Sequence, residues 1–318
     1  IMGILDTPPG FVTGGSIRFR GKDLLTMGKD ERRLVRGEGI AMVFQDALSA
    51  LNPVFTVGFQ IAEPLRIHLD MSRADAKATA LRLLEDVGIP EPEKRLGQYP
   101  HELSGGMRQR IMIAMALACE PTLLFADEPT TALDVTVQAQ ILDLIQAQRQ
   151  DRNMSVILVT HDLGVVAGHT DEIIVMYAGQ VVEQAPTHLL FSEMRMPYTE
   201  ALMESIPKLD DPSHTRLRAI AGRPPDLINP PKGCRFSPRC PYVQDRCREE
   251  APPLAEAETP GHLYACWYPV GSDAWHEAKA RAAESGQDKA RAAESGQNTA
   301  RAAEGVALPP PTRAAGGV

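Results

Sequence analysis

The residues best suited to chemistry are two adjacent carboxylates, Asp127 and Glu128, which directly follow the apolar run 123–126. Ligands of α/β proteins bind at the carboxyl ends of parallel strands, so a carboxylate pair in this position is expected to face a crevice. One carboxylate could hold Mg²⁺, usually through water, while the other orients or deprotonates an attacking water molecule. Alone, Asp127-Glu128-Pro129 would more simply be an exposed acidic turn that caps the next helix, so its context decides.

A second segment with chemical potential is Ser104-Gly105-Gly106, at the start of an expected helix. Serine is a good N-cap, and the two glycines let backbone N–H groups approach an anion beside the positive end of the helix. This arrangement suits the γ-phosphate of a nucleotide, although Ser-Gly-Gly alone more often marks only a capped helix. Its place shortly before the strand that ends in Asp127-Glu128 favours phosphate binding.

A histidine, His161, follows the apolar run 156–159 in the sequence Thr160-His161-Asp162. A lone histidine after a strand is more often structural than functional. Here it lies 33 residues after Glu128 and again follows an expected strand. This spacing favours a functional role in the same site.

The elements that must position these residues alternate between strands and helices. Strands are expected at 40–44, 122–127, 156–159 and 173–177, and helices at about 105–119 and 135–150. Residues 11–45 have the pattern of short strands broken by turns, and the pattern of about 54–102 is helical. Such alternation implies an α/β fold with a mostly parallel sheet and helices on its faces.

Composition excludes several other classes of protein. Hydrophobic residues make up 43% of the 318 residues, yet no apolar run approaches the roughly 18 residues that span a bilayer. No charged segment followed by an apolar one opens the chain, so no secretory signal is expected. The net charge of −8 argues against a nucleic-acid partner. These features are typical of a cytosolic α/β protein.

Four of the five cysteines, Cys234, Cys240, Cys247 and Cys266, form the pattern C-x₅-C-x₆-C-x₁₈-C. In a reducing compartment, clustered cysteines more often bind metal than form disulfides. Because the close C-x₂₋₄-C pairs typical of zinc are missing, the spacing favours a [4Fe–4S] cluster, with Zn²⁺ as the alternative and unmetallated thiols as a third reading. The nearby His262 could replace one ligand. Cys119 lies apart and is expected to be a small core residue.

Residues 1–205 resemble the ATPase subunits of ABC transporters, and more narrowly those of oligopeptide and dipeptide importers. The segment 43–46 with Leu51-Asn52-Pro53 resembles their Q-loop region, except that Ala47 stands where the family commonly has Pro. Residues 99–110 resemble their signature, including Met107 where most ABC proteins have Gln. The block 233–269 resembles the C-terminal extension of the same importers.

The resemblance implies roles for individual residues. Gln45 would sense Mg²⁺ and the attacking water and couple the site to the membrane partner. Asp127 would bind Mg²⁺, Glu128 would polarise water, and His161 would contact the γ-phosphate. The residues expected at the interface between two ATPase subunits are the signature Ser104, Gly105, Gly106 and Met107 and the D-loop Asp134.

The resemblance also implies a function: ATP hydrolysis with Mg²⁺ that powers peptide import at the cytoplasmic face of the cell membrane. The expected partners are two transmembrane permease subunits, a second ATPase subunit that is favoured to be a paralogue, and indirectly an extracytoplasmic peptide-binding protein. One alternative is a non-catalytic subunit that donates only its signature in trans. Another is a soluble ABC ATPase of nucleic-acid metabolism, in which the cysteines would form a zinc module.

Three regions are expected along the chain. Residues 1–205 would form the ABC ATPase domain, with a helical subdomain at about 46–102. Residues 206–270 would form the cysteine-containing extension. Residues 271–318 would form a low-complexity, disordered tail, because Ala-Arg-Ala-Ala-Glu recurs at 280–284, 290–294 and 300–304 and the low aromatic content and Gly/Pro interruptions leave the segment unable to bury a core.

The phosphate loop (Walker A), G-x-x-x-x-G-K-[ST], is found nowhere in the 318 residues. In family members, a run like Ile1–Leu5 lies on the helix just behind that loop, and residues 1–40 contain no degraded Gly-Lys-Ser. A loop lost in evolution would leave altered residues in place, whereas truncation leaves none. We therefore expect an incomplete or mis-started sequence, with a genuine absence as the alternative. In this form the chain alone is not expected to turn over ATP.

Overall fold

The computed structural model describes residues 1–131, 133–206 and 220–282. The chain divides into two compact units, Ile1–His169 and Thr170–Val318, which are described separately below. Within the described residues, no helix is both long and apolar enough to cross a membrane.

The first unit is built on a parallel sheet of three strands in the order β3 (Ile40–Val43), β4 (Leu123–Asp127) and β5 (Ser155–Val159). β4 pairs with β3 from Leu123 opposite Ile40, and with β5 from Leu123 opposite Ser155. Leu124 and Ala126 of the central strand are fully buried. Three of the four predicted strands therefore form a parallel sheet, whereas the fourth, at 173–177, forms β6 of an antiparallel sheet in the second unit.

A short hairpin and a helix precede this sheet. The hairpin pairs β1 (Arg18–Phe19) with β2 (Lys22–Asp23), and α1 spans Lys29–Glu38. The sequence pattern predicted only strands and turns here. No residue of α1 is buried, and its backbone is non-helical at Arg36 and Gly37. Its ten residues include only two apolar ones, Leu34 and Val35, too few for the sequence pattern to reveal a helix.

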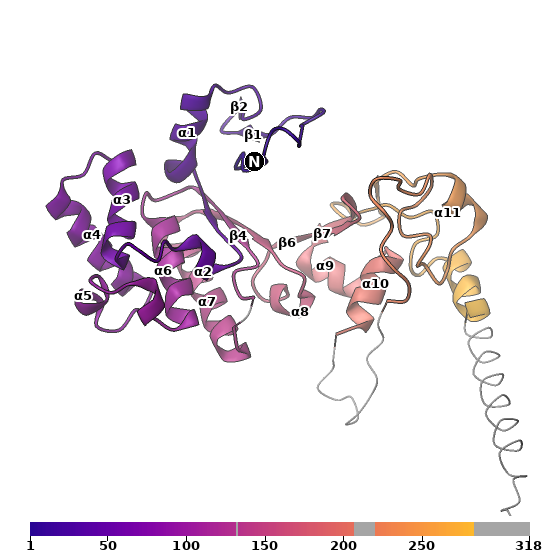
Figure 1. The fold of residues 1–318 in the computed structure, drawn as a ribbon. Helices are drawn as coiled ribbons and strands as arrows, with labels where there is room; N and C mark the ends of the chain where they lie inside the picture. The colour runs from indigo at the N-terminus through magenta and orange to yellow at the C-terminus, as the bar shows by residue number, and fades with distance from the viewer. Residues whose placement is uncertain (132, 207–219, 283–318) are drawn as a thin grey trace, which may run out of the picture. The chain divides into compact units, whose positions relative to one another are not determined.

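Most of the helices of this unit follow β3 in the sequence, and those up to residue 102 lie where the pattern was predicted to be helical (Figure 1). They are α2 (Ala47–Ala50), α3 (Val57–His68), α4 (Arg73–Asp86), α5 (Pro92–Arg95), a 3₁₀ turn at Pro100–Glu102, α6 (Gly105–Leu117), α7 (Val135–Arg152) and α8 (Leu163–Val166). Thr56 and Ser72 cap α3 and α4 by accepting hydrogen bonds from backbone N–H groups. The core joins α3 and α4 to α6 through fully buried residues such as Ile61, Leu84 and Ile111.

Gln60 of α3 is a buried polar residue that holds the loop before this helix. Its side-chain amide donates to the carbonyl oxygens of Asn52 and Phe55, both at 3.0 Å, and its Oε1 accepts from the Asn52 N–H at 2.8 Å. Gln60→Leu would leave these three backbone groups without their partner. We expect a loss of about 2–4 kcal/mol in the free energy of unfolding, measured by urea denaturation. Gln150→Leu, at an exposed position of α7, is the matched control, and an equal effect of both changes would contradict this role.

The second unit contains an antiparallel sheet of β6 (Glu172–Tyr177), β7 (Gln180–Pro186), β9 (Leu263–Tyr264) and β8 (Ala255–Glu256), in that order. Its helices include α9 (Thr187–Ser192), α10 (Pro197–Glu204) and α11 (Asp245–Glu249). β7 pairs with β9 at Glu183 opposite Tyr264. The cysteine-containing extension therefore shares a sheet with strands that the sequence analysis placed in the ATPase domain.

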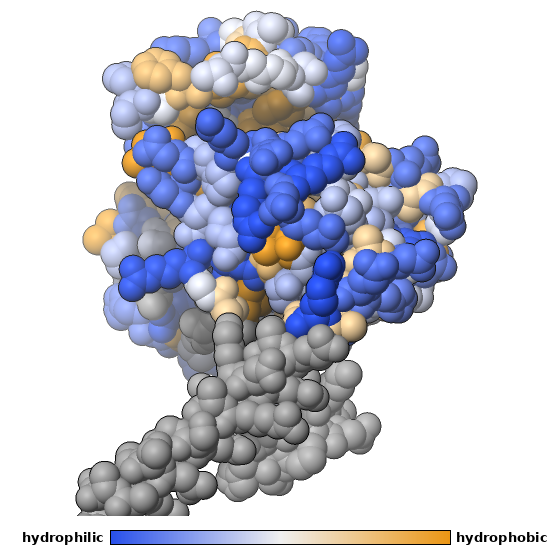
Figure 2. All heavy atoms as spheres, turned by 90° about the vertical axis from the view of Figure 1, so that its right-hand side faces the viewer, coloured by the Kyte–Doolittle hydropathy of each residue, from blue (hydrophilic) through white to orange (hydrophobic). Residues whose placement is uncertain are grey.

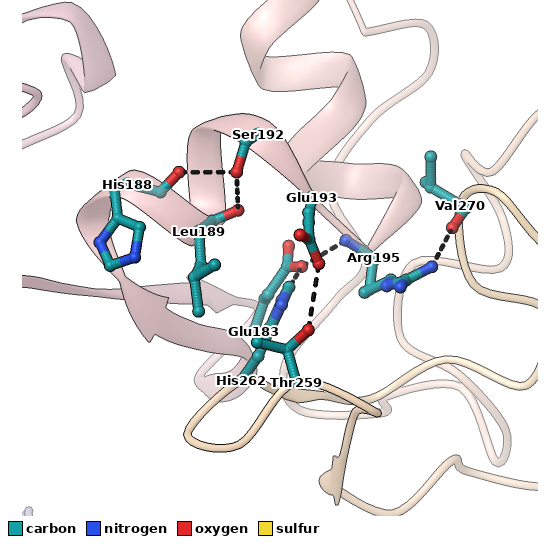
Figure 3. Close-up of polar contacts among 9 residues, drawn as sticks. All are labelled: Glu183, His188, Leu189, Ser192, Glu193, Arg195, Thr259, His262 and Val270. Carbon is teal, nitrogen blue, oxygen red and sulfur yellow. Dashed lines mark hydrogen bonds and ion pairs between the residues drawn. The ribbon is translucent and has the colours of Figure 1, made fainter.

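A buried pair of ionisable side chains joins the same two segments (Figure 3). Glu183 and His262 are both fully buried, and His262 Nε2 lies 2.9 Å from Glu183 Oε1. The backbone N–H of Arg195 donates to the same oxygen, and the hydroxyl of Thr259 donates to Glu193 at 3.2 Å. These contacts fasten the segment around 259–262 to β7 and to the turn after α9.

Residues 273–282 form a helix, although the sequence analysis predicted a disordered tail from 271 onward. Trp275 is 7% exposed, its ring lies 5.7 Å from that of Tyr242, and its indole N–H donates to Glu200 at 3.3 Å. Lys279 forms an ion pair with Glu200 at 3.0 Å. The packing of Trp275 and the contacts with Glu200 therefore stabilise a helix that the composition of the repeat does not predict. The remainder of the repeat lies outside the described residues.

Figure 2 shows a mainly hydrophilic face with small hydrophobic areas.

Candidate functional site

The carboxylate pair lies at the carboxyl end of β4, where the sequence placed it. Asp127 is the last residue of the strand and lies opposite Val159 of β5. The N–H of Glu128 donates to the carbonyl of Val159 at 2.8 Å. The φ of Glu128 is +43°, in the left-handed region that non-glycine residues rarely adopt. Such strain persists only where surrounding contacts enforce it, and it is common at functional sites.

Three side chains from different parts of the chain converge on the Glu128 carboxylate. Gln45 Nε2 donates to Oε2 at 2.9 Å, and the Thr131 hydroxyl donates to the same oxygen at 2.8 Å. His161 Nδ1 lies 3.1 Å from Oε1. Gln45 follows β3 and His161 follows β5, so the ends of all three parallel strands contribute. Of the predicted site residues, the structure thus brings Gln45, Glu128 and His161 into direct contact.

These contacts determine the charge state of the site. The Thr131 hydroxyl is the main cause that holds the pKa of Glu128 below its ordinary value, followed by the hydrogen bonds of His161 and Gln45, while desolvation opposes them. Glu128 is therefore ionised near neutral pH and suited to orient a water molecule rather than to donate a proton. Because its pKa is depressed, these contacts stabilise the fold above the unfolded-state pKa and are lost as the pH falls through the folded-state pKa. The Glu128 side chain is 23% exposed, so this stabilisation is screened by solvent.

The signature segment begins α6. Ser104 caps the helix by accepting from the Met107 N–H at 3.4 Å, and Ser104 and Gly105 are exposed. A Cβ on Gly106 would lie 3.1 Å from Val137 Cγ1, so glycine permits the close approach of α6 and α7 there. No hydrogen bond or ion pair joins this segment to the Glu128 carboxylate within the described residues.

Asp134 has a local structural role as the N-cap of α7. Its side chain accepts from the Val137 N–H at 3.0 Å. The acidic turn of Asp127 and Glu128 therefore does not cap α7. The cap also places the exposed start of α7 beside the signature, since Val137 approaches Gly106.

The four clustered cysteines line one small pocket. The other residues around it are mainly apolar and include Met196, Pro197, Phe236, Pro252 and Trp267. Burial raises the pKa of the Cys234 and Cys266 thiols and raises that of Cys240 to about 12, with the neighbouring thiols adding to the effect. Within the described part of the chain, no three or more His, Cys, Asp or Glu side chains are arranged to hold a single metal ion.

The sequence analysis also assigned roles to His262 and Cys119. His262 does not line the cysteine pocket, and its Nε2 faces Glu183, so the suggestion that it replaces a cysteine ligand is wrong. Cys119 is buried, and burial raises its pKa to about 11. It is therefore a protonated core thiol, as expected.

Sequence reasoning missed Thr131, which contacts Glu128 as closely as any predicted residue does. A signal was present: a hydroxyl residue stands three positions after Glu128, with Pro129 between them. Proline is favoured at the second position of a β-turn, and a turn brings its first and fourth residues together. That pattern could have placed the Thr131 hydroxyl beside the carboxylate.

Comparisons with known proteins agree with this site and fold. The family model described as "ABC transporter" matches residues 2–131, and the model described as "Oligopeptide/dipeptide transporter, C-terminal region" matches residues 182–247. The dipeptide transport ATP-binding protein DppD of Escherichia coli (strain K12) is 48% identical over 270 residues, which cover 85% of this chain and 82% of DppD. The oligopeptide transport ATP-binding protein OppD of Salmonella typhimurium is also 48% identical over 270 residues, covering 85% of this chain and 79% of OppD.

Among solved structures, the dimeric post-hydrolysis state of the ATP-binding cassette MJ0796 with ADP and Pi matches with a TM-score of 0.50 and 29% identity. It covers 55% of this chain and 74% of the cassette. The cassette fold, the matching family models and relatives at about half identity agree with one another. The chain therefore belongs to the ATPase family of ABC transporters, in the branch of the oligopeptide and dipeptide importers.

Proposed function

We propose that this chain is the ATP-hydrolysing subunit that powers peptide import through an ABC transporter. The observation that carries the proposal is the convergence of Gln45 and His161 on Glu128 at the ends of three parallel strands. This is a site for nucleotide chemistry, and relatives that are 48% identical to this chain over 270 residues are named for dipeptide and oligopeptide transport.

Hydrolysis in such a site depends on positioning and electrostatic stabilisation. Bound Mg²⁺ would neutralise the charge that develops on the phosphates, and Asp127 would hold it. Glu128 is ionised and would orient the attacking water. Gln45 would sense the metal, and His161 would contact the γ-phosphate. Both also contact Glu128 and would link these groups to its carboxylate.

The signature Ser104–Met107 would complete a nucleotide site of a second ATPase subunit, in line with its exposure at the start of α6. A paralogue is the favoured second subunit. The remaining partners would be two transmembrane permease subunits and, through them, an extracytoplasmic peptide-binding protein. This assembly would hold the chain at the cytoplasmic face of the membrane.

One alternative is a non-catalytic subunit that offers only its signature in trans. Titration of the isolated chain with Mg²⁺-ATP distinguishes the two, because tight binding would exclude the non-catalytic role. The other alternative, a soluble ATPase of nucleic-acid metabolism, is tested by affinity purification from membranes: recovery of permease subunits supports import, and recovery with nucleic acid alone contradicts it.

We further propose that Cys234, Cys240, Cys247 and Cys266 hold a [4Fe–4S] cluster. The support is the donor set: four thiols line one mainly apolar pocket. Burial raises the pKa of the Cys240 and Cys266 thiols, so their thiolates would form there only with a bound cationic group. Each thiolate of such a cluster binds a different iron, so the four need not approach one another as the ligands of a single ion do. The cluster would cross-link the loops of the extension.

Cys240→Ser is expected to abolish cluster binding. Anaerobically purified wild-type chain should contain iron and sulfide and absorb in the visible range, and the variant should lose nearly all of this signal. Cys119→Ser, which alters the buried cysteine outside the pocket, is the matched control and should retain it. Zinc without iron in the wild type, or a metal-free wild type, would contradict the proposed cluster.

A further inference from the structure

Thr131 makes two hydrogen bonds to Glu128. Its backbone N–H donates to the Glu128 carbonyl at 3.1 Å, which closes a four-residue turn from Glu128 to Thr131. Its hydroxyl donates to Glu128 Oε2 at 2.8 Å. Pro129 occupies the second position of this turn, where its fixed φ is favourable. Backbone and side chain of one residue thus fix the conformation of Glu128 together.

The other two partners of the carboxylate differ in origin. Gln45 lies 83 residues before Glu128 and His161 lies 33 residues after it, each beyond the end of another strand. In the proposed function both face the nucleotide, and each would then have a second partner in Mg²⁺ or phosphate. Thr131 belongs to the same turn as Glu128 and would remain in place when those partners change.

The backbone of Glu128 has a strained conformation that neighbouring contacts must hold. Its φ of +43° lies in the left-handed region, which non-glycine residues rarely adopt. A hydroxyl donor to Oε2 restricts rotation of the carboxylate and leaves Oε1 for His161 or for a water molecule. A charge-assisted hydrogen bond of this kind is stronger than one between neutral groups.

We propose that Thr131 is a positioning residue for ATP hydrolysis: it holds the Glu128 carboxylate in place independently of Gln45 and His161. The role in hydrolysis rests on the proposed function of the site. The contact itself does not, so it can be tested in the isolated chain without nucleotide.

The test is a ¹³C NMR relaxation measurement, at one neutral pH, of how far the Glu128 side chain is ordered in the full chain labelled with ¹³C-glutamate, with Glu128→Gln used to assign the signal. Thr131→Val preserves shape and removes the donor, so the Glu128 side chain should become more mobile. Thr131→Ser keeps the hydroxyl and should leave the side chain as ordered as in the wild type. Thr79→Val, on α4, is the matched control and should change nothing. If the Glu128 side chain is as ordered in Thr131→Val as in the wild type, the proposal is overturned, whether or not the chain hydrolyses ATP.

A second measurement uses the reconstituted importer in which a phosphate loop completes the site containing Glu128. Thr131→Val should lower kcat roughly tenfold, leave the KM for ATP unchanged and move the acid limb of the pH–rate profile to higher pH. Thr131→Ser should restore both kcat and the position of the acid limb. A loss of activity in Thr131→Val that Thr131→Ser fails to rescue, with no movement of the acid limb, would mean a merely structural role and would overturn the proposal.

Discussion

Glu128→Gln is expected to lower ATP turnover by about 10²–10³-fold at the nucleotide site that contains it. The change removes the negative charge that orients water and nearly preserves the size of the side chain. It also replaces an acceptor of three hydrogen bonds with an amide, so Gln45, Thr131 and His161 cannot all keep their present contacts. Binding of ATP depends on other groups, and the KM should change little.

Turnover and ATP binding should be measured on reconstituted importer, with Glu85→Gln as the control. Glu85 is an exposed glutamate on α4, and the same change there should leave turnover unaltered. Turnover within twofold of wild type in Glu128→Gln would show that the carboxylate has no catalytic part. A parallel loss of ATP binding would assign it to binding instead.

Ser104→Arg is expected to abolish productive association of this chain with a second ATPase subunit in the presence of ATP. Ser104 is exposed at the first turn of α6, where its hydroxyl accepts from the Met107 N–H. Arginine would remove this cap, at a cost of about 1 kcal/mol, and would place a long side chain over the phosphate-binding surface. Turnover at the site completed by this signature should fall by about 10²-fold or more.

Ser72→Arg is a closely matched control, because Ser72 also caps a helix, α4, by accepting from a backbone N–H. Both variants lose a cap, but only Ser104→Arg alters the signature. ATP-dependent dimerisation with the partner subunit, measured by size-exclusion chromatography, should be lost only in Ser104→Arg. An equal loss in both would mean that helix stability, and not contact with nucleotide, explains the effect.

The two sets of variants also separate a catalytic subunit from one that only donates its signature. A catalytic subunit needs both Glu128 and Ser104. A subunit that only donates its signature needs Ser104 alone. An importer that contains the Glu128→Gln variant of such a subunit would hydrolyse ATP at the wild-type rate.

The parallel sheet and the core of the site could be predicted because each follows from local sequence. An apolar run flanked by polar residues indicates a buried strand, and the polar residues just after β3, β4 and β5 must meet at one edge of the sheet. Glu128 and His161 were found in this way, whereas Gln45 was identified only through the resemblance to the ABC importers. The exposed helix α1 has only two apolar residues, Leu34 and Val35, and was missed.

Other features depend on tertiary contacts that a single sequence does not encode visibly. Glu183 and His262 are 79 residues apart, and nothing in either segment indicates that they pair. The short strands β8 and β9 exist because β7 offers an edge to pair with. The helix at 273–282 depends on Trp275 reaching Glu200 and Tyr242. Such pairings come from the fold as a whole.

A subunit that supplies the energy of ATP hydrolysis to peptide import must be needed for transport itself. Uptake of a labelled peptide can be measured in proteoliposomes that contain the permease subunits, the partner ATPase and this chain, with ATP on the side of the ATPase subunits and the peptide-binding protein on the other. We expect uptake that requires ATP and this chain and is lost in Glu128→Gln. Uptake that continues at the wild-type rate without this chain, or with Glu128→Gln in its place, would contradict it.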